Sequence, residues 1–139
     1  MSLPPSGVPA GYSGKTVIAK LGLKPGQTMA VIDPPAHIEE LAAPLPDGAR
    51  MVVGFDASAE LVWLFVKNRA ALEAAASTVT GAALGASLWV SWPKKSSKLF
   101  IDLTEDGLRQ VLLPTGWVDV KVCAVDADWS GLKFLRRKT

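Results

Sequence analysis

The sequence predicts a three-layer α/β fold, in which helices cover both faces of a mostly parallel sheet. Three observations lead to this prediction. Short apolar runs of strand length alternate with segments whose apolar residues have helical spacing, and turn residues such as Pro, Gly and Asp separate them. Several runs are apolar throughout, which is typical of parallel strands buried on both faces. The polar connection 126–131 is short, so the last strand should return antiparallel.

Length and composition indicate one globular domain. The chain has 139 residues, of which 49% are hydrophobic and 20% charged, enough for its own core. We expect a flexible lead-in over 1–12 and a single α/β domain over 13–139. The longest apolar run, 61–66, is too short to cross a membrane, and the N-terminus lacks a secretion pattern, so we expect a cytoplasmic protein without membrane contact. A net charge of +2 with mixed signs argues against a nucleic-acid partner.

The first half of the chain should supply two helices and two strands. Ser13 can cap the first helix and Gly22 can end it, while the apolar run from Met29 to Ile32 has the character of a buried strand. A second, short helix is expected after the prolines that follow this strand, and a turn then leads into the second strand. In chain order, these elements should cover 13–21, 29–32, 38–41 and 50–55.

The second half should supply four strands and two helices. An alanine-rich stretch with high helix propensity follows the third strand, and Gly85 ends it. The pattern Asp102-x-x-Glu105 predicts the start of the last helix. In chain order, the elements should be strand 61–66, helix 69–84, strand 87–92, a helix from 102, and strands 117–125 and 132–136. The tryptophans expected in the core are Trp63, Trp89, Trp117 and Trp129.

The carboxyl ends of the parallel strands are the expected place for a ligand, because ligands of such sheets gather where the strand order reverses. Three segments should meet there: 33–36, 67–68 and 92–97. The stretch 89–98 around the last of them is the richest, since three lysines and several hydroxyls stand beside an aromatic ring and can donate to an anion. The candidate anion-binding residues are Trp92, Lys94, Lys95, Ser96 and Ser97. The alternative is a solvated basic loop that caps a buried strand.

A nucleotide or S-adenosylmethionine site is the second possibility, and one feature argues against it. Such a site needs glycines after the first strand, where the backbone must turn sharply and donate N–H groups to the ligand. Pro34 and Pro35 stand there instead, and proline has no N–H. Asp56, just beyond the second strand, could receive a ribose hydroxyl. The candidate residues of this alternative cofactor site are Asp33, Pro34, Pro35 and Asp56.

His37 and Cys123 are the only histidine and cysteine, so neither a disulfide within the chain nor a His/Cys metal site can form. We expect His37 at the surface at a helix start, and Cys123 as an inert thiol in a strand. One histidine also leaves no convincing Ser-His-Asp or Cys-His arrangement.

Four segments resemble an uncharacterised bacterial family, the domain of unknown function DUF 3052: 11–14, 20–26, 88–95 and 118–133. The specific part is Trp-Pro-Lys-Lys, beginning at Trp92, and Trp-Ser-Gly-Leu-Lys, beginning at Trp129. The resemblance implies a shortened, Rossmann-like fold similar to S-adenosylmethionine-dependent methyltransferases. It brings no activity, cofactor or catalytic residue with it.

The sequence is therefore consistent with three functional hypotheses. The first is a non-catalytic domain that weakly binds a small anionic metabolite, with a degenerate cofactor loop and no cofactor. The second is a methyltransferase that binds S-adenosylmethionine in an unusual pocket. The third is a protein-interaction or homo-oligomeric module, anchored by an exposed tryptophan such as Trp92 or Trp129.

Overall fold

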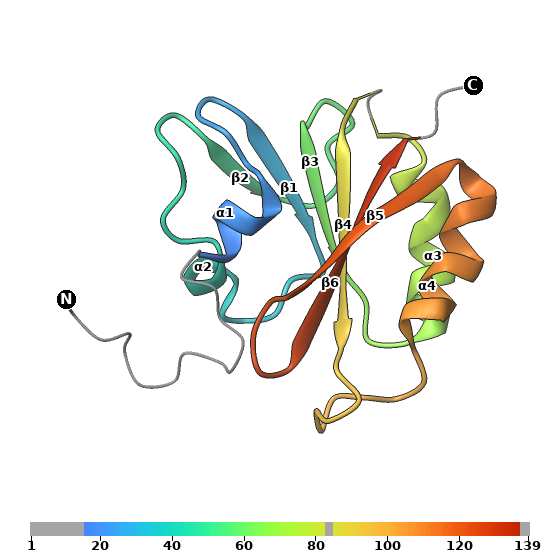
Figure 1. Ribbon diagram of the computed structural model, residues 1–139. Helices are drawn as coiled ribbons and strands as arrows, with labels where there is room; N and C mark the ends of the chain where they lie inside the picture. The colour runs from blue at the N-terminus through green and yellow to red at the C-terminus, as the bar shows by residue number, and fades with distance from the viewer. Residues whose placement is uncertain (1–15, 83–84, 137–139) are drawn as a thin grey trace.

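A computed structural model describes residues 16–82 and 85–136, and within them the chain forms one six-stranded sheet (Figure 1). The strand order is β2-β1-β3-β4-β6-β5. Neighbours among β1 to β4 are parallel, and β6 runs antiparallel to both β4 and β5. The strands are β1 (Thr28–Ile32), β2 (Arg50–Val53), β3 (Leu61–Phe65), β4 (Ser87–Pro93), β5 (Trp117–Ala124) and β6 (Trp129–Arg136).

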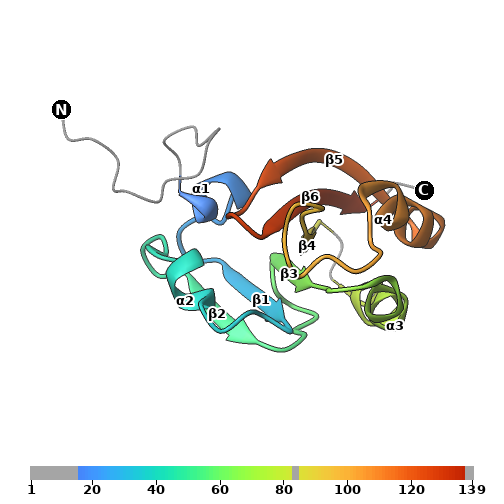
Figure 2. The ribbon, with the colours of Figure 1, turned by 90° about the horizontal axis from the view of Figure 1, so that it is seen from below.

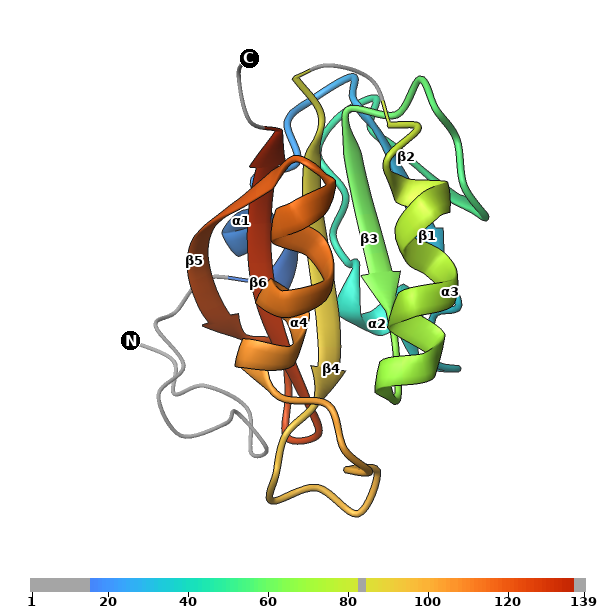
Figure 3. The same ribbon diagram turned by 90° about the vertical axis from the view of Figure 1, so that its right-hand side faces the viewer.

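Helices lie on both faces of this sheet. They are α1 (Val17–Leu21), α2 (Ile38–Leu41), α3 (Arg69–Val79) and α4 (Glu105–Leu112), followed by the 3₁₀ turn η1 (Leu113–Thr115). Figure 2 shows α1 and α2 on one face and α3 and α4 on the other. In Figure 3, α3 and α4 lie side by side, where the Arg69 guanidinium donates to the Gln110 amide oxygen at 2.7 Å. The three-layer, mostly parallel α/β fold with an antiparallel strand is therefore confirmed.

Two of the four helix starts that the sequence proposed are wrong, those of α1 and α4, whereas α2 and α3 begin at the expected residues, Ile38 and Arg69. Thr16 caps α1 by accepting the Ala19 N–H at 3.1 Å, so the helix begins four residues later than expected; Ser13 lies outside the described residues. Thr104 caps α4 by accepting the Gly107 N–H at 3.2 Å. The carboxylate of Asp102 is engaged elsewhere, because it accepts the backbone N–H of Arg69 at 3.0 Å. In both helices, the hydroxyl of the residue just before the first turn accepts a backbone N–H that has no partner within the helix.

Several ends also differ from the expected ones. α3 stops at Val79 rather than continuing to 84, and β2 ends at Val53, before Gly54, whose φ is 104°. β6 begins at Trp129, three residues earlier than expected, because this residue already pairs with Pro93 of β4. The end of α1 agrees with the prediction, since Gly22 adopts φ 86° and donates its N–H to Ile18 O. The expected lead-in over 1–12 lies outside the described residues.

The core has two parts, one on each face of the sheet. Val62, Leu64, Trp92 and Trp117 belong to the part under α3 and α4, and Met29, Trp63, Trp89 and Trp129 to the part under α1 and α2. All four tryptophans expected in the core are at most 2% exposed. No helix in the described ranges has the length and apolar character needed to cross a membrane.

Candidate functional site

The cavity at the carboxyl ends of β1 and β3 lies where the sheet topology changes direction. The two strands are neighbours, but β1 leads to α2 on one face and β3 leads to α3 on the other. The connections that follow the two strands therefore diverge and leave a cavity of about 680 Å³ between them, which we call the switch-point cavity. Its lining comes from residues 33–37 after β1, residues 65–68 and Ala71 around the start of α3, Leu99, Asp128 and Trp129.

The segment after β1 gives this cavity few donors. Asp33 adopts φ 52°, the left-handed region that glycine usually occupies, and Pro34 and Pro35 follow it. The chain thus makes its turn with an aspartate, and the next two residues have no N–H. Asp33, Pro34 and Pro35 all line the cavity, as the alternative cofactor site required.

Asp56, the fourth residue of that alternative site, lies elsewhere. Its carboxylate accepts the backbone N–H of Ser58 at 2.9 Å and the Ser58 hydroxyl at 2.7 Å, and it does not line the cavity. These hydrogen bonds to the Ser58 side chain and backbone lower the pKa of Asp56 below its ordinary value. Asp56 therefore closes a local turn and is not in position to receive a ribose hydroxyl.

The opposite wall of the cavity combines aromatic and polar groups. Phe65 and Trp129 meet edge to face, with ring centroids 5.3 Å apart. Asn68 caps α3 by accepting the Ala71 N–H at 2.8 Å, and Lys67 is exposed beside it. Trp129 is 2% exposed, and none of the hydrogen bonds among the described residues involves its indole N–H.

The loop between β5 and β6 closes the third side of the cavity, and no local sequence pattern indicated that it would take part in the site. Asp126 accepts the backbone N–H groups of Asp128 and Trp129, both at 2.8 Å, and its other oxygen lies 2.8 Å from His37 Nε2. His37 does stand at the start of α2 with its side chain 40% exposed, but it lines the cavity and pairs with an acid 89 residues away. Only the fold brings these two residues together.

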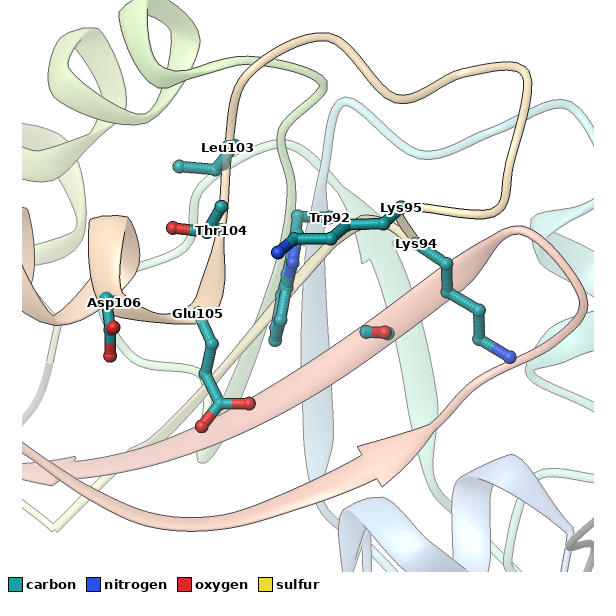
Figure 4. Close-up of a pocket in the computed structure, with 8 residues that line it drawn as sticks. Trp92, Lys94, Lys95, Leu103, Thr104, Glu105 and Asp106 are labelled. Carbon is teal, nitrogen blue, oxygen red and sulfur yellow. The ribbon is translucent and has the colours of Figure 1, made fainter.

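A second, smaller hollow lies beyond β4, next to the start of α4. Its volume is about 420 Å³, and we call it the Trp92 hollow (Figure 4). Of the five residues proposed for anion binding, Trp92, Lys94 and Lys95 line it; Ser96 and Ser97 do not. The Ser97 hydroxyl donates to Asp128 at 2.8 Å instead. The remaining lining residues are Leu103, Thr104, Glu105, Asp106 and Ser130.

Acidic side chains oppose the two lysines in this hollow, which the loop sequence did not indicate. Glu105 and Asp106 lie 2.5 Å and 3.1 Å from the Arg109 guanidinium, and Asp119 of β5 lies 3.0 Å from it. Hydrogen bonds to Asp119 and Glu105 raise the pKa of Arg109, so the guanidinium stays charged. One positive charge thus serves three carboxylates.

Neither tryptophan suggested as an anchor for a partner chain is exposed, since Trp92 is 6% and Trp129 2% accessible. Cys123 lies in β5 as expected, and burial raises the pKa of its thiol. Among residues 16–82 and 85–136, no group of three or more His, Cys, Asp or Glu could hold a metal ion.

Solved structures with this fold include methyltransferases. The chain is similar to a SAM-dependent methyltransferase from Aquifex aeolicus, with a TM-score of 0.62, 13% identity and coverage of 85% of this chain and 86% of that one. It is also similar to the ribosomal protein L11 methylase of Lactobacillus delbrueckii subsp. bulgaricus (TM-score 0.58, 14% identity, 88% and 76% covered). A third is an O-methyltransferase family 2 protein from Planctomyces limnophilus (TM-score 0.59, 11% identity, 81% and 50% covered). The fold is methyltransferase-like.

No family model and no curated protein matches the chain, so its place in the DUF 3052 family stays a prediction. The cavity is large enough for S-adenosylmethionine, but its residues do not fit that group in the usual way. The turn after β1 lacks the N–H donors of a glycine loop, and the acid beyond β2 points into its own turn.

Proposed function

We propose that this chain is a non-catalytic domain that binds a small ligand in the switch-point cavity of a methyltransferase-like scaffold. One observation supports the proposal: the cavity is present at the carboxyl ends of β1 and β3, but the turn after β1 lacks the N–H donors of a glycine loop. About 680 Å³ of space lies where this kind of sheet holds its ligands, while Asp33, Pro34 and Pro35 replace the donor-rich turn.

The lining favours an uncharged ligand with a flat ring, such as a nucleoside. Phe65, Trp129 and the two prolines offer apolar contact, and Lys67 and Asn68 offer polar groups at the rim. Asp33 and Asp128 carry two negative charges against the one positive charge of Lys67. A polyphosphate would meet repulsion there, because its several negative charges exceed what one lysine can balance.

Adenosine and ATP are the ligands that test this proposal. We expect adenosine to raise the unfolding temperature and to change tryptophan fluorescence through Trp129, because a ligand that binds only the native state stabilises it. ATP should bind no more tightly than adenosine. Absence of both effects with millimolar adenosine would reject a nucleoside as the ligand.

A pair of variants locates the binding. Ala71→Phe places a ring in the cavity from the first turn of α3, whereas Ala74→Phe makes the same change on the same helix at an exposed residue outside the lining. Adenosine binding should be lost in the first variant and kept in the second. Equal binding in the two variants would show that the ligand is elsewhere.

The second candidate function is methyl transfer from S-adenosylmethionine, and the fold itself favours it. Calorimetry with S-adenosylmethionine and S-adenosylhomocysteine separates the two candidates. A dissociation constant in the micromolar range, together with loss of binding in Ala71→Phe, would replace the non-catalytic proposal with this one. Binding no tighter than that of adenosine would support the non-catalytic domain.

Self-association remains a separate prediction, and neither Trp92 nor Trp129 can anchor it without the fold opening. Light scattering of the intact chain over a range of concentrations tests it, and a constant monomer mass would reject it.

A further inference from the structure

The floor of the Trp92 hollow is a buried side chain with an unused donor. Trp92 is 6% exposed, and its indole N–H makes no hydrogen bond with the described residues but is not fully enclosed; among those residues, the fully buried indole N–H without a partner is that of Trp117. The indole groups of Trp63 and Trp89 differ, because they donate to Ser91 Oγ at 2.8 Å and to Leu21 O at 2.9 Å. An indole N–H at the wall of a cavity is available to an acceptor from outside the chain.

One wall of the hollow is positive. The Lys94 N–H donates to Asp128 O at 2.8 Å, and the Ser97 N–H donates to Lys94 O at 2.9 Å, so the backbone that carries the lysines is held in place. The ammonium groups of Lys94 and Lys95 form no ion pair with the described residues. In Figure 4, Lys95 extends across the upper end of the Trp92 ring, whereas Lys94 extends away from it.

The other wall is negative. Figure 4 shows the Glu105 carboxylate on the side of the Trp92 ring away from Lys94. Glu105, Asp106 and Asp119 share the single charge of Arg109, which leaves two negative charges uncompensated within the group. The hollow therefore carries both signs of charge on separate walls, and a simple anion would be drawn to one wall and repelled by the other.

We propose that the Trp92 hollow binds a free α-amino acid in its zwitterionic form. The carboxylate of the ligand accepts from the Lys95 ammonium and the Trp92 indole N–H, and its ammonium group donates to Glu105. Leu103, which is 1% exposed, provides an apolar surface beside these groups. The proposal changes the anionic metabolite expected from the loop sequence into a ligand that carries both charges. It is independent of the nucleoside proposal, because it concerns a different cavity.

Chemical variants of one ligand test the requirement for two charges. L-leucine keeps both charged groups, N-acetyl-L-leucine lacks the ammonium group, and L-leucinamide lacks the carboxylate. We expect L-leucine to bind roughly tenfold or more tightly than either derivative, because each derivative loses a charge-assisted hydrogen bond. Binding is followed by the ¹⁵N–¹H signals of the tryptophan indoles, with the Trp92 signal assigned by its loss in Trp92→Phe.

Three results would overturn the proposal. The first is equal binding of the three leucine compounds, and the second is a Trp92 indole signal that none of them moves. The third is binding of inorganic phosphate at this signal as tightly as L-leucine, which would restore a simple anion site.

Matched variants locate the two charges. Lys95→Ala should weaken L-leucine binding about tenfold, while Lys98→Ala removes an exposed lysine of the same loop that does not line the hollow. Glu105→Gln should weaken it similarly; its control, Glu73→Gln, removes the acid of an i,i+4 pair with arginine outside the hollow. If Lys98→Ala weakens L-leucine binding as much as Lys95→Ala does, and Glu73→Gln as much as Glu105→Gln, the amino acid binds outside the hollow. Ala71→Phe should leave L-leucine binding unchanged, which separates this test from that of the nucleoside.

Discussion

The two cavities lie at the same end of one sheet and differ in how the chain builds them. The switch-point cavity results from topology, because β1 and β3 send their connections to opposite faces. The Trp92 hollow results from one loop, 94–103, which leaves β4 and returns to the start of α4 on a single face. Each is bounded by a buried tryptophan, Trp129 in the first and Trp92 in the second.

Their linings also differ in chemistry. Rings and proline surfaces prevail in the switch-point cavity, whereas opposed lysines and carboxylates prevail in the Trp92 hollow. Position in the fold and the charge of the lining therefore give separate information about a ligand. The first cavity has the place of a cofactor site without its turn, and the second has charged groups of both signs at a place that strand order alone does not mark.

The largest expected effect tests whether Trp92 and Trp129 contribute equally to the stability of the core. Trp129→Ala and Trp92→Ala should each lower the free energy of unfolding by about 3–5 kcal/mol, since each removes a buried aromatic side chain. The loss should be greater for Trp129, which also loses its edge-to-face contact with Phe65. Urea unfolding measures both, with the corresponding Phe variants as controls. A loss below 1 kcal/mol for Trp92→Ala would mean that this side chain does not support the core.

The next effect tests the loop between β5 and β6. Asp126→Ala removes the acceptor of two backbone N–H groups and the partner of His37, so the free energy of unfolding should fall by about 1–3 kcal/mol. Asp126→Asn keeps one side-chain oxygen as an acceptor and should lose less. The NMR signals of His37 should move in both variants. If they stay in place, the contact between α2 and this loop does not exist in solution.

A smaller effect tests the hydrogen bond between the loop after β4 and Asp128, a residue that lines the switch-point cavity. Ser97→Ala removes the hydroxyl that donates to Asp128 and should lower the free energy of unfolding by about 0.5–1.5 kcal/mol. Ser96 is exposed and has no such bond, so Ser96→Ala is the matched control and should change nothing. Urea unfolding compares the two; equal stability would show that the loop is held by its backbone alone.

The smallest effect concerns Asp56, the residue of the alternative cofactor site that lies outside both linings. Ser58→Ala should raise the pKa of Asp56 toward its ordinary value. Both the Ser58 hydroxyl and the turn that it stabilises favour the charged form of Asp56 over the protonated form. A lowered pKa stabilises the native state above the ordinary pKa of the group, and this contribution is lost as the pH falls through the native value. The variant should therefore lose less stability than the parent on acidification. NMR titration of Asp56 measures the pKa, and adenosine binding should be unchanged. A change in adenosine binding would instead connect Asp56 to the switch-point cavity.

The sequence determined the order and type of the elements, because strand and helix periodicity depend on neighbours along the chain. It also determined the unusual turn at Asp33, Pro34 and Pro35, whose backbone chemistry is local. The starts of α1 and α4 were wrong because several residues near each of them could act as a cap. Whether a carboxylate such as Asp102 caps its own helix or binds Arg69 depends on tertiary contacts.

Only the tertiary structure decided which side chains share a cavity. His37 meets Asp126, Ser97 turns to Asp128, and the Arg109 cluster stands opposite the lysines, over sequence separations that no local pattern encodes. Asp56 was assigned to a cofactor site by its place after β2, yet a hydrogen bond two residues along the chain holds it away. The physical reason is that a binding site depends on distances in space, whereas the sequence directly constrains only short distances along the chain.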